Sequence, residues 1–180
     1  FNPIQELLRR LLRNDLSEAQ AKAIEDDDTS RQNQTVTRYQ NLQLAACYSS
    51  YLEDRYGRYQ QALAIIHNEN NRIDDPIHQA LVLWDLELFF EVHEVLEHSW
   101  YSAKGRMKLT LQALIRAAGV YIKREYGFSG PAARIATKAI PVLTANRRLL
   151  ARYFEVDKLT AALQSEDPPP KLLSSNWDQQ

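Results

Sequence analysis

The sequence has no long apolar run, a single cysteine and few glycines, and each shortage narrows what the protein can be. No stretch approaches the about 18 consecutive apolar residues of a membrane-spanning helix, so we expect no contact with a membrane. The single cysteine, Cys47, excludes a disulfide within the chain, and we find no signal-peptide pattern. Both observations favour a reducing compartment, and we expect a cytoplasmic location.

The residues that are abundant favour helices. Apolar residues make up 44% and charged residues 25% of the 180-residue chain, which is ordinary for a soluble globular protein. Alanine, leucine, arginine, glutamine and glutamate are all good helix formers. We therefore predict an all-α fold without a sheet. The prediction is a compact bundle of about seven or eight helices, built from helix-turn-helix hairpins. The packing of these hairpins should loosely resemble that of tetratricopeptide repeats.

Changes in composition along the chain suggest three segments. Residues 1–30 are predicted to form an N-terminal helical arm, because residues 25–34 are polar and acidic without an apolar period and read as a linker. Residues 35–164 are predicted to form a single helical domain. Residues 165–180 begin with prolines and are predicted to form an extended tail, which three apolar side chains pin to the body or to a partner: Leu172, Leu173 and Trp177.

Glycine and proline positions suggest where the hairpins turn. A helix over 36–54 and a second over 59–66 would be joined by a turn at Gly57. Pro141 is expected to kink or restart the helix that contains it, because proline removes a backbone hydrogen bond and clashes with the preceding turn.

Charge is unevenly distributed along the chain although the net charge is −1. Residues 1–100 contain 17 acidic and 9 basic residues, whereas residues 101–158 contain 12 basic and 3 acidic residues. We expect acidic and basic halves to pack against each other. We do not expect a nucleic-acid surface, because few aromatic residues lie among the candidate basic side chains: Lys104, Arg106, Lys108, Arg147, Arg148 and Arg152.

The segment 89–100, FFEVHEVLEHSW, is the most informative stretch of the chain. It reads as a helix with several acidic residues, no lysine or arginine, and an apolar stripe. His93 and Glu97, spaced i and i+4, lie beside this stripe and can contact each other. Glu91 and His98 are expected to point away from it. Because an isolated buried charge is costly, a carboxylate beside the stripe needs a partner.

The next helix, over 107–126, offers partners for these carboxylates. A short connection makes the two helices antiparallel neighbours, and Gln112 and Arg116 lie on a polar stripe beside the apolar face of the second helix. We predict that Glu94 or Glu97 contacts Gln112 or Arg116. The predicted polar seam has five members: His93, Glu94, Glu97, Gln112 and Arg116.

The same two helices carry a family resemblance. An aromatic pair, the pattern Glu-x-His-Glu-x-x-Glu, a tryptophan and then Leu-Gln-x-Leu-Ile make residues 78–164 resemble the family called domain of unknown function 309. The matching residues are Phe89, Phe90, Glu91, His93, Glu94, Glu97, Trp100, Leu111, Gln112, Leu114, Ile115 and Ala132. Arg116 stands where a glutamine is common in the family. The resemblance implies an all-helical fold and no established activity.

Two functional interpretations remain open. The seam can be a hydrogen-bond network that fixes helix register in a non-catalytic module for binding a protein or small-molecule partner; we favour this reading, and it needs no metal or other cofactor. Alternatively, His93-Glu94-x-x-Glu97 resembles the zincin motif of a metal-dependent hydrolase. His93 and Glu97 would then bind a divalent metal, Glu94 would be the catalytic base, and a histidine elsewhere, His78 or His67, would be the third ligand. No pattern specifies an oligomeric state.

Overall fold

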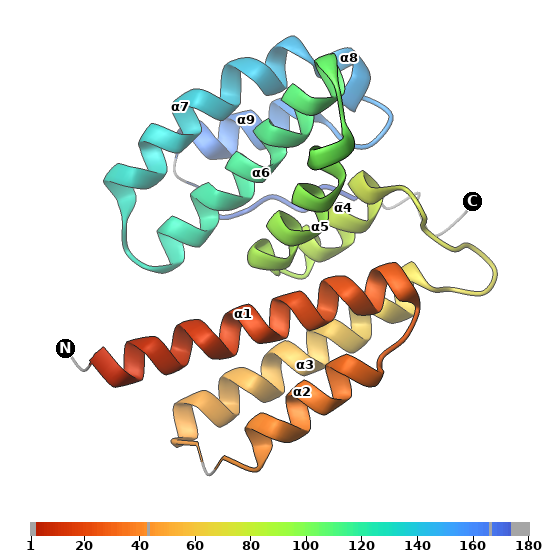
Figure 1. Ribbon diagram of the computed structural model, residues 1–180. Coiled ribbons are helices and arrows are strands. Elements are labelled where there is room, and N and C mark those ends of the chain that lie inside the picture. Colours follow the sequence, from red (N-terminus) through yellow and green to blue (C-terminus); the bar gives the residue numbers. More distant parts are fainter. Residues whose placement is uncertain (1–2, 43, 166, 174–180) are drawn as a thin grey trace. The chain divides into compact units, whose positions relative to one another are not determined.

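The structure, a computed structural model, describes residues 3–42, 44–165 and 167–173 (Figure 1). Within these ranges it is all-α, with nine helices and no strand, as predicted. The chain divides into two compact units, Phe1–Arg72 and Ile73–Gln180, which we call the N-terminal and C-terminal units. None of the helices in the described ranges is both long and apolar enough to span a membrane.

The N-terminal unit consists of three helices: α1 (Pro3–Asp26), α2 (Ser30–Gln40) and α3 (Ala46–Ile66). α1 packs against both α2 and α3. Leucine and alanine at helical spacing form the buried face of α1. A buried polar contact joins α1 to α2, where the Gln32 amide donates to the Gln20 side chain, and the Gln60 amide of α3 donates to Gln32 at 2.9 Å.

The structure of this unit differs from the predicted segments. The first 30 residues are part of a three-helix unit, and the polar stretch 25–34 holds the end of α1 and the start of α2. Gly57 is not a turn but lies within α3, because a single glycine costs a helix only about 1 kcal/mol. The predicted helix 36–54 is instead interrupted, because α2 ends at Gln40 and α3 begins at Ala46.

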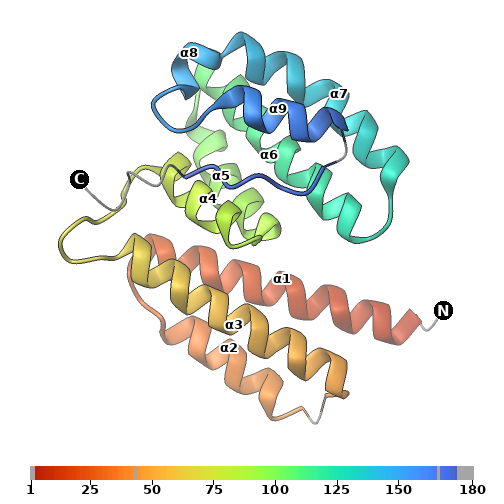
Figure 2. The ribbon, with the colours of Figure 1, turned by 180° about the vertical axis from the view of Figure 1, so that it is seen from behind.

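The C-terminal unit contains the remaining six helices: α4 (Pro76–Asp85), α5 (Phe89–Ser102), α6 (Gly105–Glu125), α7 (Ser129–Ala145), α8 (Arg147–Leu150) and α9 (Val156–Ser165). α6 packs against α5 on one side and α7 on the other, α4 packs against α5, and α9 packs against α7 (Figures 1 and 2). Alanines of α6 and α7 are fully buried at this packing, so the two helices approach closely.

Local sequence signals set several of these helix ends. Asp75 caps α4: its Oδ1 accepts from the backbone N–H of Ile77 at 2.8 Å and of His78 at 3.2 Å, with Pro76 at the first helical position. Gly127, with φ of 75°, follows the end of α6.

Pro141 does not end its helix. α7 continues through Pro141 to Ala145, and the next helix, α8, starts only after Asn146. The buried Asn146 side chain donates to the Val142 carbonyl at 2.8 Å, which helps to close the end of α7.

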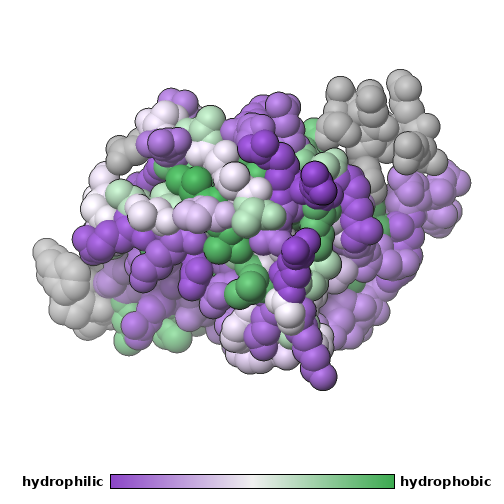
Figure 3. Space-filling model, turned by 90° about the horizontal axis from the view of Figure 1, so that it is seen from above, coloured by the Kyte–Doolittle hydropathy of each residue, from purple (hydrophilic) through white to green (hydrophobic). Residues whose placement is uncertain are grey.

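The surface that is seen from the side of α7 and α8 is mainly hydrophilic, with apolar residues in small groups (Figure 3). Several ion pairs join acids and bases within one unit. In the N-terminal unit, for example, Arg31 pairs with Glu18 at 2.6 Å, and Arg38 pairs with Asp15. The acidic residues of the first half are thus neutralised in part by arginines of that half.

Candidate functional site

The candidate site lies on α5. Phe89, Val92, Val95 and Leu96 are buried and hold this helix against α4 and α6. His93, Glu94 and Glu97 stand beside this buried face and are each about one-third exposed, with side-chain exposures of 34%, 32% and 38%. Their backbone is fixed by core packing while each side chain remains partly exposed.

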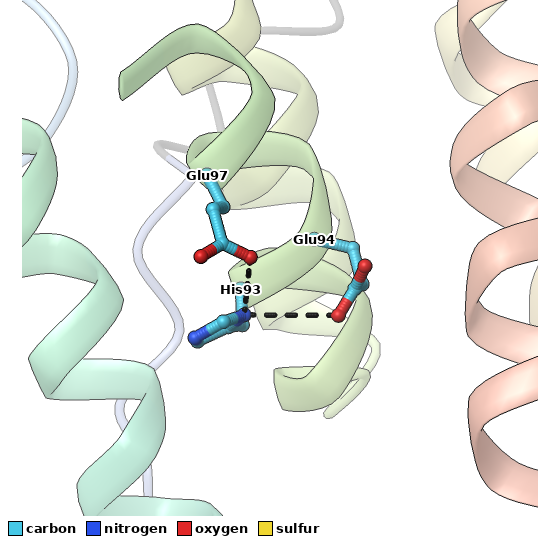
Figure 4. Close-up of side chains that lie close together, drawn as sticks. All are labelled: His93, Glu94 and Glu97. Carbon is cyan, nitrogen blue, oxygen red and sulfur yellow. Dashed lines mark ion pairs between the residues drawn. The ribbon is translucent and has the colours of Figure 1, made fainter. Parts of the chain in front are cut away.

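The three side chains converge on one point (Figure 4). His93 Nδ1 lies 3.8 Å from Glu94 Oε1 and 3.7 Å from Glu97 Oε2. One ligand atom from each residue lies within 4.8 Å of the other two, and among the described residues these three form the one such group of histidine, cysteine and acidic side chains. We call it the His93 cluster.

The two carboxylates set the electrostatics of the cluster. The neighbouring Glu94 carboxylate raises the pKa of His93 most, and the negative charges of Glu97 and Glu94 raise it further, whereas burial of the ring opposes them. The separations from His93 Nδ1 exceed hydrogen-bond length, so the contacts are ion pairs when the ring is protonated. Nδ1 itself is buried and forms no hydrogen bond with any part of the chain that is described.

The predicted seam between α5 and α6 is only partly present. Gln112 and Arg116 are half-buried on α6. Within the described ranges, no hydrogen bond or ion pair joins either of them to Glu94 or Glu97, because both carboxylates turn along their own helix toward His93. The structure therefore brings together three of the five predicted residues.

A residue of the basic set, one turn before Gln112, links the two helices. Lys108 places its ammonium 4.3 Å from the centre of the Trp100 ring, a cation–π contact between α6 and α5. Two other members of the basic set are also used inside the unit, since Arg147 pairs with Asp157 and Arg152 stacks on Tyr153 at 4.6 Å.

The burial of Glu91 was not predicted from the sequence. Glu91 was expected to point away from the apolar stripe, but its exposure is 0%. The signal for this burial is Val95, spaced i+4 from Glu91, which widens the buried face toward that side. His98, by contrast, is exposed as expected.

Neither histidine that was considered as a third ligand joins the cluster. His67 belongs to the N-terminal unit, where Nδ1 lies 2.8 Å from Asp27 and Nε2 lies 3.1 Å from the Ile24 carbonyl oxygen. His78 packs its ring against Tyr153, with 4.7 Å between ring centroids. The third group at the cluster is instead Glu94, to which the sequence reading gave the role of catalytic base.

The donor set of the His93 cluster suits a first-row divalent metal. One imidazole nitrogen and two carboxylate oxygens are ligand types that zinc accepts at about 2.0–2.2 Å. Ligands at that distance in a tetrahedron stand about 3.3–3.6 Å apart. The two separations from His93 Nδ1, 3.7 and 3.8 Å, are longer than this, and all three ligand atoms lie within 4.8 Å of one another. Side-chain rotations that draw the three atoms together would be needed to bind the ion.

Comparison with known proteins bears on the same stretch. Residues 77–135 match the family model described as Domain of unknown function (DUF309). The match runs from α4 into the first part of α7 and includes the whole His93 cluster. It confirms the resemblance seen in the sequence, although it ends at residue 135 rather than 164. The searches of curated proteins and of solved structures found no match.

Proposed function

We propose that the C-terminal unit is a non-catalytic binding module whose ligand is a divalent metal ion, held by His93, Glu94 and Glu97. The observation that supports this proposal is the convergence of three ligand atoms within 4.8 Å of one another, with Nδ1 of the imidazole left without a hydrogen bond among the described residues. The proposal departs from our sequence-based expectation of no metal, because that expectation assigned the carboxylates to Gln112 and Arg116.

Zinc is the ion that the donor set favours. Calcium takes about six to eight oxygen ligands, and an imidazole nitrogen is a poor substitute for one of them. Imidazole with carboxylate suits zinc and its first-row neighbours. Their affinities for a given site rise from manganese to copper and fall again at zinc, so availability also decides which ion is bound. Three protein ligands leave at least one coordination position for water or for a group of a partner molecule.

A hydrolytic role receives less support from this geometry. The zincin-like mechanism needs a general base in addition to the metal ligands. Glu94 was the candidate for that base, but its carboxylate lies among the ligand atoms at 3.8 Å from His93 Nδ1. The open coordination position therefore fits the recognition of a protein or small-molecule partner better than the activation of water. A cytoplasmic location stays a prediction, which cell fractionation tests.

Calorimetric titration of zinc into chelator-treated full-length protein tests the proposal. We expect one zinc per chain in the wild type and loss of this binding in His93→Ala. Glu94→Gln and Glu97→Gln should each weaken binding by at least about tenfold, because each removes a ligand charge while keeping the shape of the side chain.

The matched control is His98→Ala, which removes an exposed histidine of the same helix outside the cluster. It should bind zinc as the wild type does. Equal binding by wild type and His93→Ala, or loss of binding only in the His98 variant, would reject the assignment.

A further inference from the structure

An extended segment that follows α9 lies on the C-terminal unit. Residues 167–173, which we call the proline strap, run alongside α6 and α4 (Figures 1 and 2). Their sequence is Asp-Pro-Pro-Pro-Lys-Leu-Leu. Leu172 is buried, with 5% of its surface exposed, as predicted for the tail. Leu173 is half-buried, and Trp177, the third predicted anchor, lies outside the described residues.

Two side chains at the end of α4 form hydrogen bonds with the backbone of the strap. The indole N–H of Trp84 donates to the Pro170 carbonyl at 2.9 Å. The Asp85 carboxylate accepts two successive backbone N–H groups, from Leu172 at 2.7 Å and from Leu173 at 3.1 Å. These contacts address main-chain groups that any extended peptide with a suitably placed proline would present.

A second contact holds the other end of the strap. The Arg124 guanidinium of α6 donates to the Asp167 carbonyl at 3.1 Å and to the Leu163 carbonyl at the end of α9 at 2.9 Å. Asp85 and Arg124 thus grip the strap at two places, again through its backbone. Burial raises the pKa of the Asp85 carboxyl, and the two N–H groups of the strap oppose that rise.

The prolines between these grips lie beside aromatic rings. Trp84, Phe89 and Tyr121 pack together with ring centroids 5.1 to 5.3 Å apart. A cavity of about 290 Å³ beside these rings is lined by Phe89, Tyr121, Pro168 and Pro169 together with charged residues, among them Arg124. The Tyr121 hydroxyl is buried and has no hydrogen-bond partner among the described residues, and the Arg124 guanidinium lies 5.1 Å from the centre of the Tyr121 ring.

Aromatic walls with a tryptophan N–H on a proline carbonyl are the features by which proline-rich peptides are recognised in general. We propose that this aromatic groove is a binding site for an extended proline-led peptide of another protein, and that the chain's own strap occupies it as an internal competitor. The peptide would carry a short run of prolines followed by a basic and an apolar residue, the pattern of the strap itself. The groove shares no ligand with the His93 cluster, so this inference is independent of the proposed metal site.

A tethered segment competes strongly with a free one. A short linker holds a segment at an effective concentration on the order of millimolar. The wild-type groove should therefore be closed to a free peptide until the strap is displaced. A variant that weakens only the strap should open the groove without altering the groove residues.

The test is a titration of full-length Leu172→Asp with a labelled peptide, Asp-Pro-Pro-Pro-Lys-Leu-Leu. We expect this variant to bind the peptide at least about tenfold more tightly than the wild type, because the internal competitor is weakened. In nitrogen-15 NMR spectra, the Trp84 indole signal, assigned by its loss in Trp84→Phe, should move in Leu172→Asp and return toward its wild-type position as peptide is added.

Three controls separate recognition from nonspecific binding. A peptide with alanines in place of the three prolines should bind at least about tenfold more weakly to Leu172→Asp, because aromatic contact with proline is lost. Adding Asp85→Asn to Leu172→Asp should also weaken binding, since an amide cannot accept both N–H groups equally. Leu109→Asp changes an exposed leucine of α6 outside the groove and should behave as the wild type does.

The proposal is overturned if Leu172→Asp shows no binding at millimolar peptide, or if the alanine peptide binds equally well. It is also overturned if the wild type dimerises with rising concentration and Leu172→Asp does not, because the groove would then serve exchange of straps between copies. If circular dichroism shows that Leu172→Asp has lost its helices, Leu172→Ser replaces it in the same measurements.

Discussion

His93 is the residue on which the proposed site depends, because it is the only nitrogen ligand of the cluster. Its neighbours Glu94 and Glu97 raise its pKa above the ordinary value of about 6.5. The charged ring therefore stabilises the folded state of the metal-free protein below about pH 6.5, and this contribution is lost as the pH rises through the raised pKa. Since the ring is one-third exposed, the contribution should be below about 1 kcal/mol.

An NMR titration of the metal-free protein measures this effect. The His93 ring protons should titrate above the range of an exposed histidine, and Glu97→Gln together with Glu94→Gln should lower the pKa of His93. A His93 pKa that is unaffected by both substitutions would contradict the electrostatic account.

The raised pKa of His93 also governs the expected metal affinity. A metal binds the neutral imidazole, so a proton on Nδ1 competes with it. Zinc affinity should increase as the pH rises through the raised pKa of His93 and should level off above it. Calorimetry in two buffers of different ionisation enthalpy counts the protons released. An affinity that does not vary with pH in this range would place the ion elsewhere on the chain.

Among the helices, α3 offers a test of how a glycine is tolerated. Gly57 lies inside α3, and a Cβ added there would meet nothing within 4 Å. Gly57→Ala should raise the free energy of unfolding by about 0.5–1 kcal/mol, because alanine has the higher helix propensity.

Gly127 serves as the opposite control for this measurement. Its φ of 75° is strained for a residue with a side chain, so Gly127→Ala should destabilise the protein by about 1 kcal/mol. Urea denaturation of both variants gives the two changes. The account of α3 is wrong if Gly57→Ala destabilises as much as Gly127→Ala does.

The start of α4 offers a second test at the level of elements. Asp75 caps the helix with Oδ1 and accepts from the Tyr153 hydroxyl with Oδ2 at 2.9 Å. Asp75→Ala should therefore cost about 1–2 kcal/mol of stability. Asp75→Asn keeps a capping oxygen and should cost less. Equal losses in thermal denaturation of the two variants would show that the cap contributes little.

These elements also show what the sequence alone could predict. The aspartate before α4, the proline at its first position and the glycine after α6 are local signals, and helix ends are present at all of them. The continuity of α3 through Gly57 and of α7 through Pro141 was not predicted, because tertiary packing outweighs the local cost of either residue.

For the molecule as a whole, the site was predictable only in part. The spacing of His93 and Glu97 along one helix predicted their contact. The placing of Glu94 beside them depends on a side-chain rotamer, and the failure of Gln112 and Arg116 to join depends on how α5 and α6 face each other; neither is visible in a sequence pattern. The proline strap joins residues 86 and more positions apart, a distance at which no local pattern applies.

The features that carry the two proposals lie in the same unit. The family match, the His93 cluster and the aromatic groove all lie in Ile73–Gln180. The N-terminal unit has its own buried polar contacts and internal ion pairs. Both proposed sites, one for a metal and one for a peptide, therefore belong to the C-terminal unit.

The most direct test of the central claim is a crystal structure of the zinc-treated full-length protein, with diffraction data collected at the zinc absorption edge. The account predicts an anomalous peak at about 2.0–2.2 Å from His93 Nδ1 and from one oxygen each of Glu94 and Glu97. Zinc bound only at His67, His78 or His98, or no zinc peak on the chain, would contradict it.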